Sequence, residues 1–244
     1  MTRTNEHGQP VGEPVPGWEP RPPPGRVTLH GRYVRLEPVA GTHAADLFDA
    51  LGHEEDDRLW TYRHDDRPAD VHHLARMIAG WADRADTVTF ALVPEETGRA
   101  SGVATLCRVD ADHGSIEVGA VLLARSLQRT RAATEALSLL ARHVFEDLGY
   151  RRLEWKLDAY NEPSARAARR LGFSYEGRFR NAMVYKGRNR DTAWFAMTDA
   201  DWPAVRSAHE RWLDPGNFDE GGRQRTALSD LTRGLAGWGP CNNG

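Results

Sequence analysis

The stretch from residue 115 to residue 173 alternates strand-like and helix-like segments, and this order limits the fold more than any other feature. Residues 115–123 are apolar and β-branched, which is typical of a strand. A helix stopped by Gly149 follows, because apolar residues recur there at helical spacing: Leu137, Leu140, Ala141, Val144 and Leu148. Residues 152–158 predict another strand, and Asn161 caps a second helix that ends at Gly172.

The rest of the chain extends this alternation on both sides. Apolar alternation predicts further strands at 27–38, 87–93, 100–109, 175–186 and 192–198. Helical spacing predicts further helices at 44–51, 69–83 and 201–213. Two helices thus precede a run of strands, and tight turns join several of those strands. This order predicts a mixed α/β fold with a largely antiparallel central sheet flanked by helices.

The two ends of the chain differ in composition from its centre. Residues 1–26 are rich in proline and lack apolar periodicity, which predicts an extended, flexible arm. Residues 215–244 form a polar, glycine-rich tail in which a short helix at 227–235 is expected. The division is therefore an arm, one domain at 27–214, and a tail.

Charge and cysteine content exclude several classes of protein. The formal net charge of −3 argues against a phosphate backbone as the main partner. Cys107 and Cys241 show no metal-ligand spacing, so neither a metal site nor a disulfide framework is expected. No apolar run approaches the roughly 20 residues that span a bilayer, and the polar start of the chain does not resemble a secretory signal. A cytoplasmic protein without a membrane partner is expected.

The start of the long helix has the composition of a phosphate site. Small residues follow Gln128 and Arg129, so the first amide N–H groups of the helix can approach an anion, and the helix dipole adds to the attraction. Further along, Asn161 and Ser164 open the second helix, and Leu171-Gly172-Phe173 closes it.

Together these motifs resemble the Gcn5-related N-acetyltransferase (GNAT) superfamily, within it the RimJ/RimL-like branch, from about residue 27 to residue 202. The last predicted hairpin, 184–191, resembles one RimL-like subgroup. In the family, the strand before the phosphate loop pairs with the pantetheine arm of acetyl-CoA or another acyl-CoA, and the loop binds the pyrophosphate. The resemblance therefore implies the following coenzyme-binding residues: Val121, Leu122, Leu123, Gln128, Arg129, Thr130, Arg131, Ala132, Ala133, Thr134, Asn161 and Ser164.

Two positions depart from the family pattern. Arg131 stands where the first loop glycine is expected, and Ala133 takes the second glycine position. The guanidinium of Arg131 either grips a coenzyme phosphate or blocks the site. Ala168 stands where many members carry a tyrosine that protonates the thiolate, and RimL-like members are thought to use the serine, here Ser164.

The resemblance also implies catalytic and acceptor-binding residues. Glu117 occupies the position of a general base that deprotonates the amine, and Ser164 that of the donor to the leaving thiolate. Trp60, Tyr62, Glu117 and Tyr185 are candidates for acceptor binding, with packing in the core as the alternative for the aromatic residues. The arginines at 125, 129 and 131 are either a solvated face or part of the coenzyme site.

The expected function is transfer of an acetyl or related acyl group from acyl-CoA to a primary amine, by direct attack in a ternary complex. The acceptor is a small-molecule or peptide amine. One alternative keeps the fold but takes its acyl group from a carrier protein or an aminoacyl-tRNA. Another is a non-catalytic CoA-binding module. Many relatives pair as dimers, so a homodimer is left open.

Overall fold

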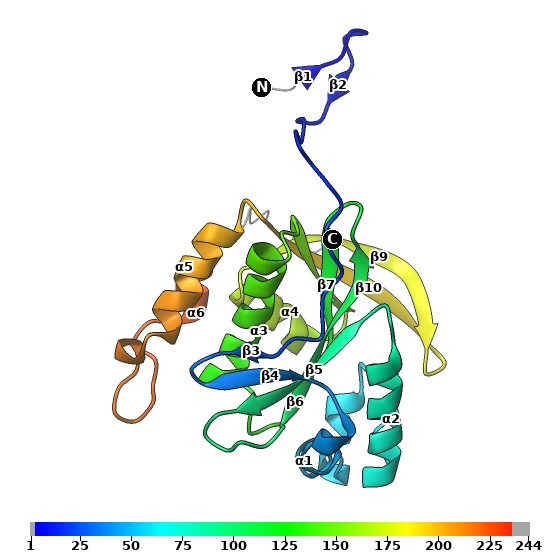
Figure 1. The fold of residues 1–244 in the computed structure, drawn as a ribbon, viewed down its shortest axis with the longest axis vertical. Helices are drawn as coiled ribbons and strands as arrows, with labels where there is room; N and C mark the ends of the chain where they lie inside the picture. Colours follow the sequence, from blue (N-terminus) through cyan, green and yellow to red (C-terminus); the bar gives the residue numbers. More distant parts are fainter. Residues whose placement is uncertain (1–2, 236–244) are drawn as a thin grey trace.

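A twisted sheet of eight strands forms the centre of residues 3–235, which the computed structural model describes (Figure 1). In spatial order the strands are β3 (Leu29–His30), β4 (Val34–Pro38), β5 (Val88–Pro94), β6 (Gly102–Asp110), β7 (Ser115–Leu123), β8 (Arg152–Asp158), β10 (Arg188–Thr198) and β9 (Ser174–Tyr185). Every neighbouring pair is antiparallel except β7 and β8. The predicted fold class, a largely antiparallel α/β sheet, is confirmed.

Helices cover the sheet because both faces of its central strands are apolar. The α-helices are α1 (Ala44–Leu51), α2 (Val71–Asp83), α3 (Arg131–Arg142), α4 (Glu162–Arg170), α5 (Trp202–Leu213) and α6 (Leu228–Thr232). The 3₁₀ segments are η1 (Gly41–His43), η2 (Glu54–Trp60) and η4 (Pro215–Asn217), and η3 (His143–Asp147) is π-helical. Helices α3, α4 and α5 lie on one side of the sheet, and α1 and α2 on the other (Figure 1). This cover explains why β5 is buried along nearly its whole length.

The helix ends follow the local signals in the sequence. Thr130 caps α3 by accepting a hydrogen bond from the Ala133 amide, and Asn161 caps α4 in the same way through the Ser164 amide. Gly149 and Gly172 end these helical segments with positive φ angles of 70° and 89°. A side chain at Gly172 would also lie 2.9 Å from Val205, so the close packing of α5 requires glycine there.

One predicted strand is divided in the structure. Residues 27–38 form β3 and β4, which are joined by a tight turn instead of running as a single strand. The turn is bound by Glu135 of α3, whose carboxylate accepts hydrogen bonds from the amides of Arg32, Tyr33 and Val34 at 2.6–3.1 Å. A partner about one hundred residues away therefore determines where this strand bends.

Part of the N-terminal segment packs on the domain. The Trp18 indole donates to the Asp112 carbonyl, and its ring lies against the guanidinium of Arg21. The Tyr150 hydroxyl donates to the Pro22 carbonyl. Before this docked segment, β1 (Arg3–Thr4) and β2 (Pro10–Val11) form a small hairpin that projects from the body (Figure 1).

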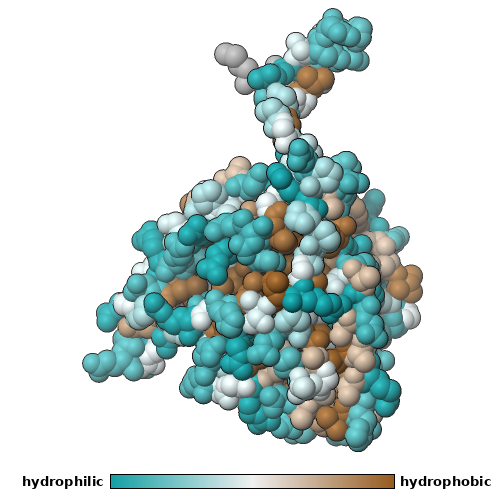
Figure 2. Space-filling view, in the orientation of Figure 1, coloured by the Kyte–Doolittle hydropathy of each residue, from teal (hydrophilic) through white to brown (hydrophobic). Residues whose placement is uncertain are grey.

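The surface in this view is mainly hydrophilic, with small apolar areas among the polar ones (Figure 2). Within residues 3–235, no helix has both the length and the apolar character needed to cross a membrane. In the predicted C-terminal tail, α6 forms inside the expected range 227–235. The predicted tail also extends to residues 236–244, which lie outside the described part of the chain.

Candidate active site

Strands β7 and β8 begin side by side and then separate. Their parallel pairing covers only Ser115–Glu117 of β7 and Arg152–Glu154 of β8. On its other edge, β7 carries a bulge against β6, where Ala120 has a φ of 51°. In the described structure, the β8-facing edge of β7 beyond Glu117, which includes the predicted residues Val121, Leu122 and Leu123, therefore pairs with no strand.

The start of α3 follows directly after this unpaired edge. Its first amide N–H groups, from Arg131 and Ala132, point out of the helix end and have no acceptor within the helix. Gln128 and Arg129 are exposed in the link before it, and the Gln128 side chain donates to the Leu123 carbonyl. A free edge of backbone thus leads to a positive helix end, the arrangement that binds anions.

The Arg131 side chain packs against two aromatic rings. Its guanidinium carbon lies 5.0 Å from the centre of the Tyr33 ring and 4.6 Å from that of Phe218. Tyr33 belongs to the turn between β3 and β4, so the side chain is directed toward that edge of the sheet. This placement argues against the alternative in which Arg131 fills the space before α3.

Ser164 and Asn161 share one cap at the start of α4. The Asn161 side chain accepts from the Ser164 amide at 3.2 Å. The Trp155 indole, from β8, donates to Ser164 Oγ at 2.9 Å. Because that oxygen already accepts from the indole, its own hydrogen is left to donate to another group.

Glu117 lies where the two strands part and is only 7% exposed. Its Oε2 lies 3.0 Å from Arg108 Nε and 3.3 Å from Lys156 Nζ, in ion pairs that lack hydrogen-bond geometry. Lys156 is closer to Glu154, at 2.7 Å. Burial raises the pKa of Glu117, and the charges of Lys156 and Arg108 offset part of that rise.

Of the predicted aromatic residues, the two tyrosines donate hydrogen bonds near the end of β8, whereas Trp60 is buried in the core. Tyr185 donates to Asp158 at 2.8 Å, and burial raises its pKa to about 12. Tyr62 donates to the Tyr160 carbonyl, which links the loop before α2 to the loop after β8. Trp60 is buried in the core at 2% exposure, with its indole donating to the Leu51 carbonyl.

The sheet brings Glu117 and Tyr185 to one face. Residues directly opposite each other on paired strands share a face, so Glu117 and Glu154 lie together, followed along β8 by Lys156 and Asp158. Asp158 holds the Tyr185 hydroxyl. This face of β8 is charged, whereas its other face carries the predicted apolar stripe.

Sequence reasoning missed several of these charged residues. In the sequence, Glu154, Lys156 and Asp158 alternate with apolar residues, and this pattern could have indicated a charged face on β8. In the structure, two of the three are buried and the side chain of the third is only 8% exposed. Arg63 gave no signal. Its side chain is 11% exposed, its guanidinium carbon lies 5.8 Å from the centre of the Trp60 ring, and it donates to the Ala120 carbonyl at the bulge of β7.

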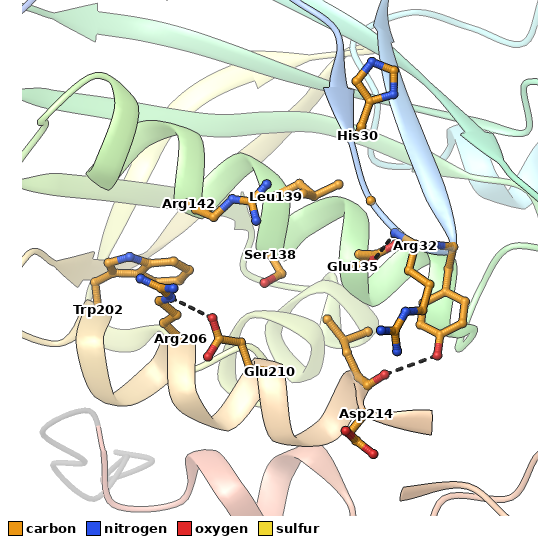
Figure 3. A pocket seen from close by; sticks show the side chains of 13 residues that line it. His30, Arg32, Glu135, Ser138, Leu139, Arg142, Trp202, Arg206, Glu210 and Asp214 are labelled. Atoms are coloured by element: carbon orange, nitrogen blue, oxygen red, sulfur yellow. Dashed lines mark hydrogen bonds and ion pairs between the residues drawn. The ribbon is translucent and has the colours of Figure 1, made fainter. Parts of the chain in front are cut away.

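Two cavities lie outside the gap between β7 and β8. One of about 370 Å³ lies between α3, α5 and the turn after β3, and none of the predicted site residues lines it (Figure 3). Its wall includes Glu135, which holds that turn, and Arg206 paired with Glu210. The other, about 300 Å³, is open and is lined by Trp60 and by Lys186 from the turn after β9.

Comparison with known proteins identifies the family. Residues 34–174 match the acetyltransferase (GNAT) domain family. A GCN5-related N-acetyltransferase from Brucella melitensis is 41% identical, covers 89% of this chain and 99% of its own, and superposes with a TM-score of 0.87. A probable acetyltransferase of the GNAT family from Chromobacterium violaceum is 36% identical, with 80% and 98% coverage and a TM-score of 0.75.

A curated relative matches over a shorter stretch. The uncharacterized N-acetyltransferase p20 of Bacillus licheniformis is 28% identical over 113 residues, which is 46% of this chain. The match spans 63% of that relative's length. The family match covers more than half of the chain and includes the parting strands, the start of α3 and the cap of α4. The chain is therefore a GNAT acetyltransferase and belongs to the Gcn5-related N-acetyltransferase family.

Proposed function

We propose that this protein transfers an acetyl or related acyl group from acyl-CoA directly to a primary amine in a ternary complex, as a member of the RimJ/RimL-like branch. One observation carries the proposal: the unpaired edge of β7 leads from buried Glu117 to the start of α3, where the first amide N–H groups have no acceptor within the helix. A pantetheine arm fits an edge with free backbone groups, and a pyrophosphate fits the helix end.

In this proposal Glu117, a backbone N–H near Leu122 and Ser164 each assist a different step of the reaction. An ammonium must lose its proton before its nitrogen can attack a thioester, and the Glu117 carboxylate accepts that proton directly or through a water. The nitrogen adds to the thioester carbonyl carbon, which forms the C–N bond and an oxyanion, and the C–S bond breaks when that oxyanion collapses. A backbone N–H near Leu122 stabilises the oxyanion. Ser164 donates its hydroxyl hydrogen toward the departing sulfur, while the Trp155 indole orients its oxygen.

Thiol release tests the proposal. The full chain is mixed with acetyl-CoA and a broad panel of primary amines, and free coenzyme A is measured with a thiol reagent. We expect release that depends on the amine. Calorimetry with acetyl-CoA separates the donors: no binding at millimolar ligand would instead favour an acyl carrier protein or an aminoacyl-tRNA. Tight coenzyme binding without turnover on any amine would indicate a non-catalytic binding module.

Replacing Ser164 with alanine should slow the chemical step and leave coenzyme affinity nearly unchanged. The variant loses the donor near sulfur, and we expect kcat to fall by about 10- to 100-fold, the lower part of the range for proton-transfer catalysis. Single-turnover kinetics and calorimetry with coenzyme A measure the two effects. A kcat equal to that of the wild type would remove Ser164 from this role.

Lys156 should control the pH dependence of Glu117. In Lys156→Met the positive charge 3.3 Å from Glu117 is lost, so the pKa of Glu117 rises further. A base works only when ionised, so the acid limb of kcat/KM should move to higher pH by about one unit. Lys156→Arg keeps the charge and should restore the profile. An unmoved limb in Lys156→Met would show that Glu117 does not set it.

A further inference from the structure

Buried polar atoms without a hydrogen-bond partner gather on one face of the sheet. Within residues 3–235, nine such side-chain atoms occur, and the loop before α2 together with β7 and β10 provides five of them: Arg63 Nε, Glu117 Oε2, Arg190 Nε, Thr192 Oγ1 and Trp194 Nε1. Folded proteins satisfy nearly all buried polar groups. A group of unsatisfied atoms in one place therefore indicates a position that a ligand fills.

Side chains from β7, β8 and β10 lie along one face of the sheet from Glu117 toward Arg190. Lys156 Nζ lies 3.3 Å from Glu117 Oε2 and 3.7 Å from the centre of the Trp194 ring. Two residues further along β8 and β10, Asp158 is paired with Thr192, and Asp158 accepts from Tyr185. The guanidinium of Arg190 lies 5.8 Å from the centre of the Tyr185 ring.

Arg190 is a buried cation without a carboxylate partner in the described part of the chain. It is 9% exposed and stands beside a register shift in β10. The nearby carboxylates are engaged elsewhere: Asp191 pairs with Arg178, and Asp158 accepts from Tyr185. Because an isolated buried charge is costly, the counter-ion of Arg190 is expected to arrive with a ligand.

Other guanidinium groups strengthen the positive potential near Arg190. His64, whose ring lies 5.5 Å from that of Tyr185 in a tilted arrangement, has its pKa lowered first by burial and then by the charge of Arg190, with smaller effects from Arg63 and Arg108. Asp65 opposes this shift and pairs only weakly with Arg63, at 3.5 Å. The end of this face near Arg190 is therefore suited to an anion, whereas Glu117 at the other end is suited to an amine.

We propose that the acyl acceptor carries an anionic oxygen group, a carboxylate or a phosphate, which Arg190 binds while the amine of the same molecule faces Glu117. This inference rests on the proposed amine acyltransferase activity and names the class of acceptor. A guanidinium binds either group through two parallel hydrogen bonds, which also orients the molecule. Arg190 is thus the specificity-determining residue of the acceptor site.

Matched acceptors that differ only in the anionic group test the inference. The probes are α-amino acids and longer ω-amino acids against their amides, and O-phosphoethanolamine and longer aminoalkyl phosphates against the matching amino alcohols, with acetyl-CoA and a thiol-release readout. For the wild type we expect the anionic member of at least one pair to have the higher kcat/KM, by about tenfold or more. The pair that shows the preference identifies a carboxylate or a phosphate.

Variants of Arg190 test whether this residue causes the preference for the anionic probe. Arg190→Gln should lower kcat/KM for the anionic probe by about 10- to 100-fold, mainly through KM, and leave that for its neutral partner unchanged. Arg190→Lys should recover part of the loss. Arg180→Gln removes an exposed arginine of the same hairpin and is the matched control. Equal losses for both probes would indicate a structural role for Arg190 and overturn the inference.

The same experiments distinguish failure of the anionic-acceptor proposal from failure of the proposed acyltransferase activity. If neutral amines are turned over as efficiently as their anionic partners, the proposal of an anionic acceptor is overturned. The proposed acyltransferase activity is then still supported. If no amine is turned over, the proposed activity fails, and calorimetry of the same probes with the protein–coenzyme A complex still tests the anion site. Binding of the anionic probe alone, lost in Arg190→Gln, supports it, whereas equal binding of both probes overturns it.

Discussion

A Glu117→Gln enzyme is expected to turn over about 100- to 10,000-fold more slowly than the wild type at saturating acetyl-CoA and amine, the range for loss of a general base. Glutamine has nearly the same shape but cannot accept the proton of an ammonium. Coenzyme affinity should stay the same, because Glu117 lies at the last paired position of β7, before the unpaired edge begins. Steady-state kinetics and calorimetry measure the two quantities.

The pH profile adds a second readout for Glu117. Burial raises its pKa, so the carboxyl group takes up a proton at higher pH than an exposed glutamate does. Activity should therefore fall as pH decreases through that raised pKa, and this limb should be absent in Glu117→Gln. Glu96→Gln, in an exposed turn, is the control. Full activity of Glu117→Gln with an unchanged profile would exclude Glu117 as the base.

Glu135→Ala should lower the free energy of unfolding by about 3 kcal/mol, since hydrogen bonds to a charged group contribute roughly 1.5–3 kcal/mol each and water replaces part of the loss. Glu135 is 9% exposed and binds three successive amides of the turn between β3 and β4. For a chain of this size, the melting temperature should fall by roughly 6–12 °C. Denaturant titration and thermal melting measure the change.

Two other variants show whether the loss of stability comes from the hydrogen bonds between Glu135 and the β3–β4 turn. Glu135→Gln keeps one oxygen acceptor and should lose less stability than alanine. Glu210→Ala removes an exposed partner of Arg206 and should cost no more than about 0.5 kcal/mol. If Glu135→Ala melts like the Glu210 variant, the three amides are satisfied by water, and Glu135 does not hold the β3–β4 turn.

Local signals were sufficient for the elements around the candidate site. The apolar stripe before Gly149 predicted the helix that becomes α3, and Asn161 and Gly172 predicted both ends of α4. These signals act within a few residues, through helix periodicity, caps and left-handed glycine, so they can be found without a fold. The split of residues 27–38 was missed because its cause, Glu135, is distant in sequence.

The environment of each site residue required the assembled sheet. Trp60 lines the second cavity, but its indole is buried and donates to the Leu51 carbonyl, a contact that the sequence did not indicate. The direction of the Arg131 side chain depends on the rings of Tyr33 and Phe218, which come from distant parts of the chain. Nothing near Arg190 in the sequence indicates that its guanidinium is buried.

The sequence by itself determined the order of strands and helices, the ends of α4, the stop at Gly149 after α3 and η3, and the family resemblance, because each depends on residues that are neighbours in the chain. Only the tertiary structure decided where β7 leaves β8, which charges surround Glu117, and that Arg190 is buried with no carboxylate partner among residues 3–235. The physical reason is that burial and charge pairing depend on groups from strands and loops far apart in sequence, and no local pattern encodes those contacts.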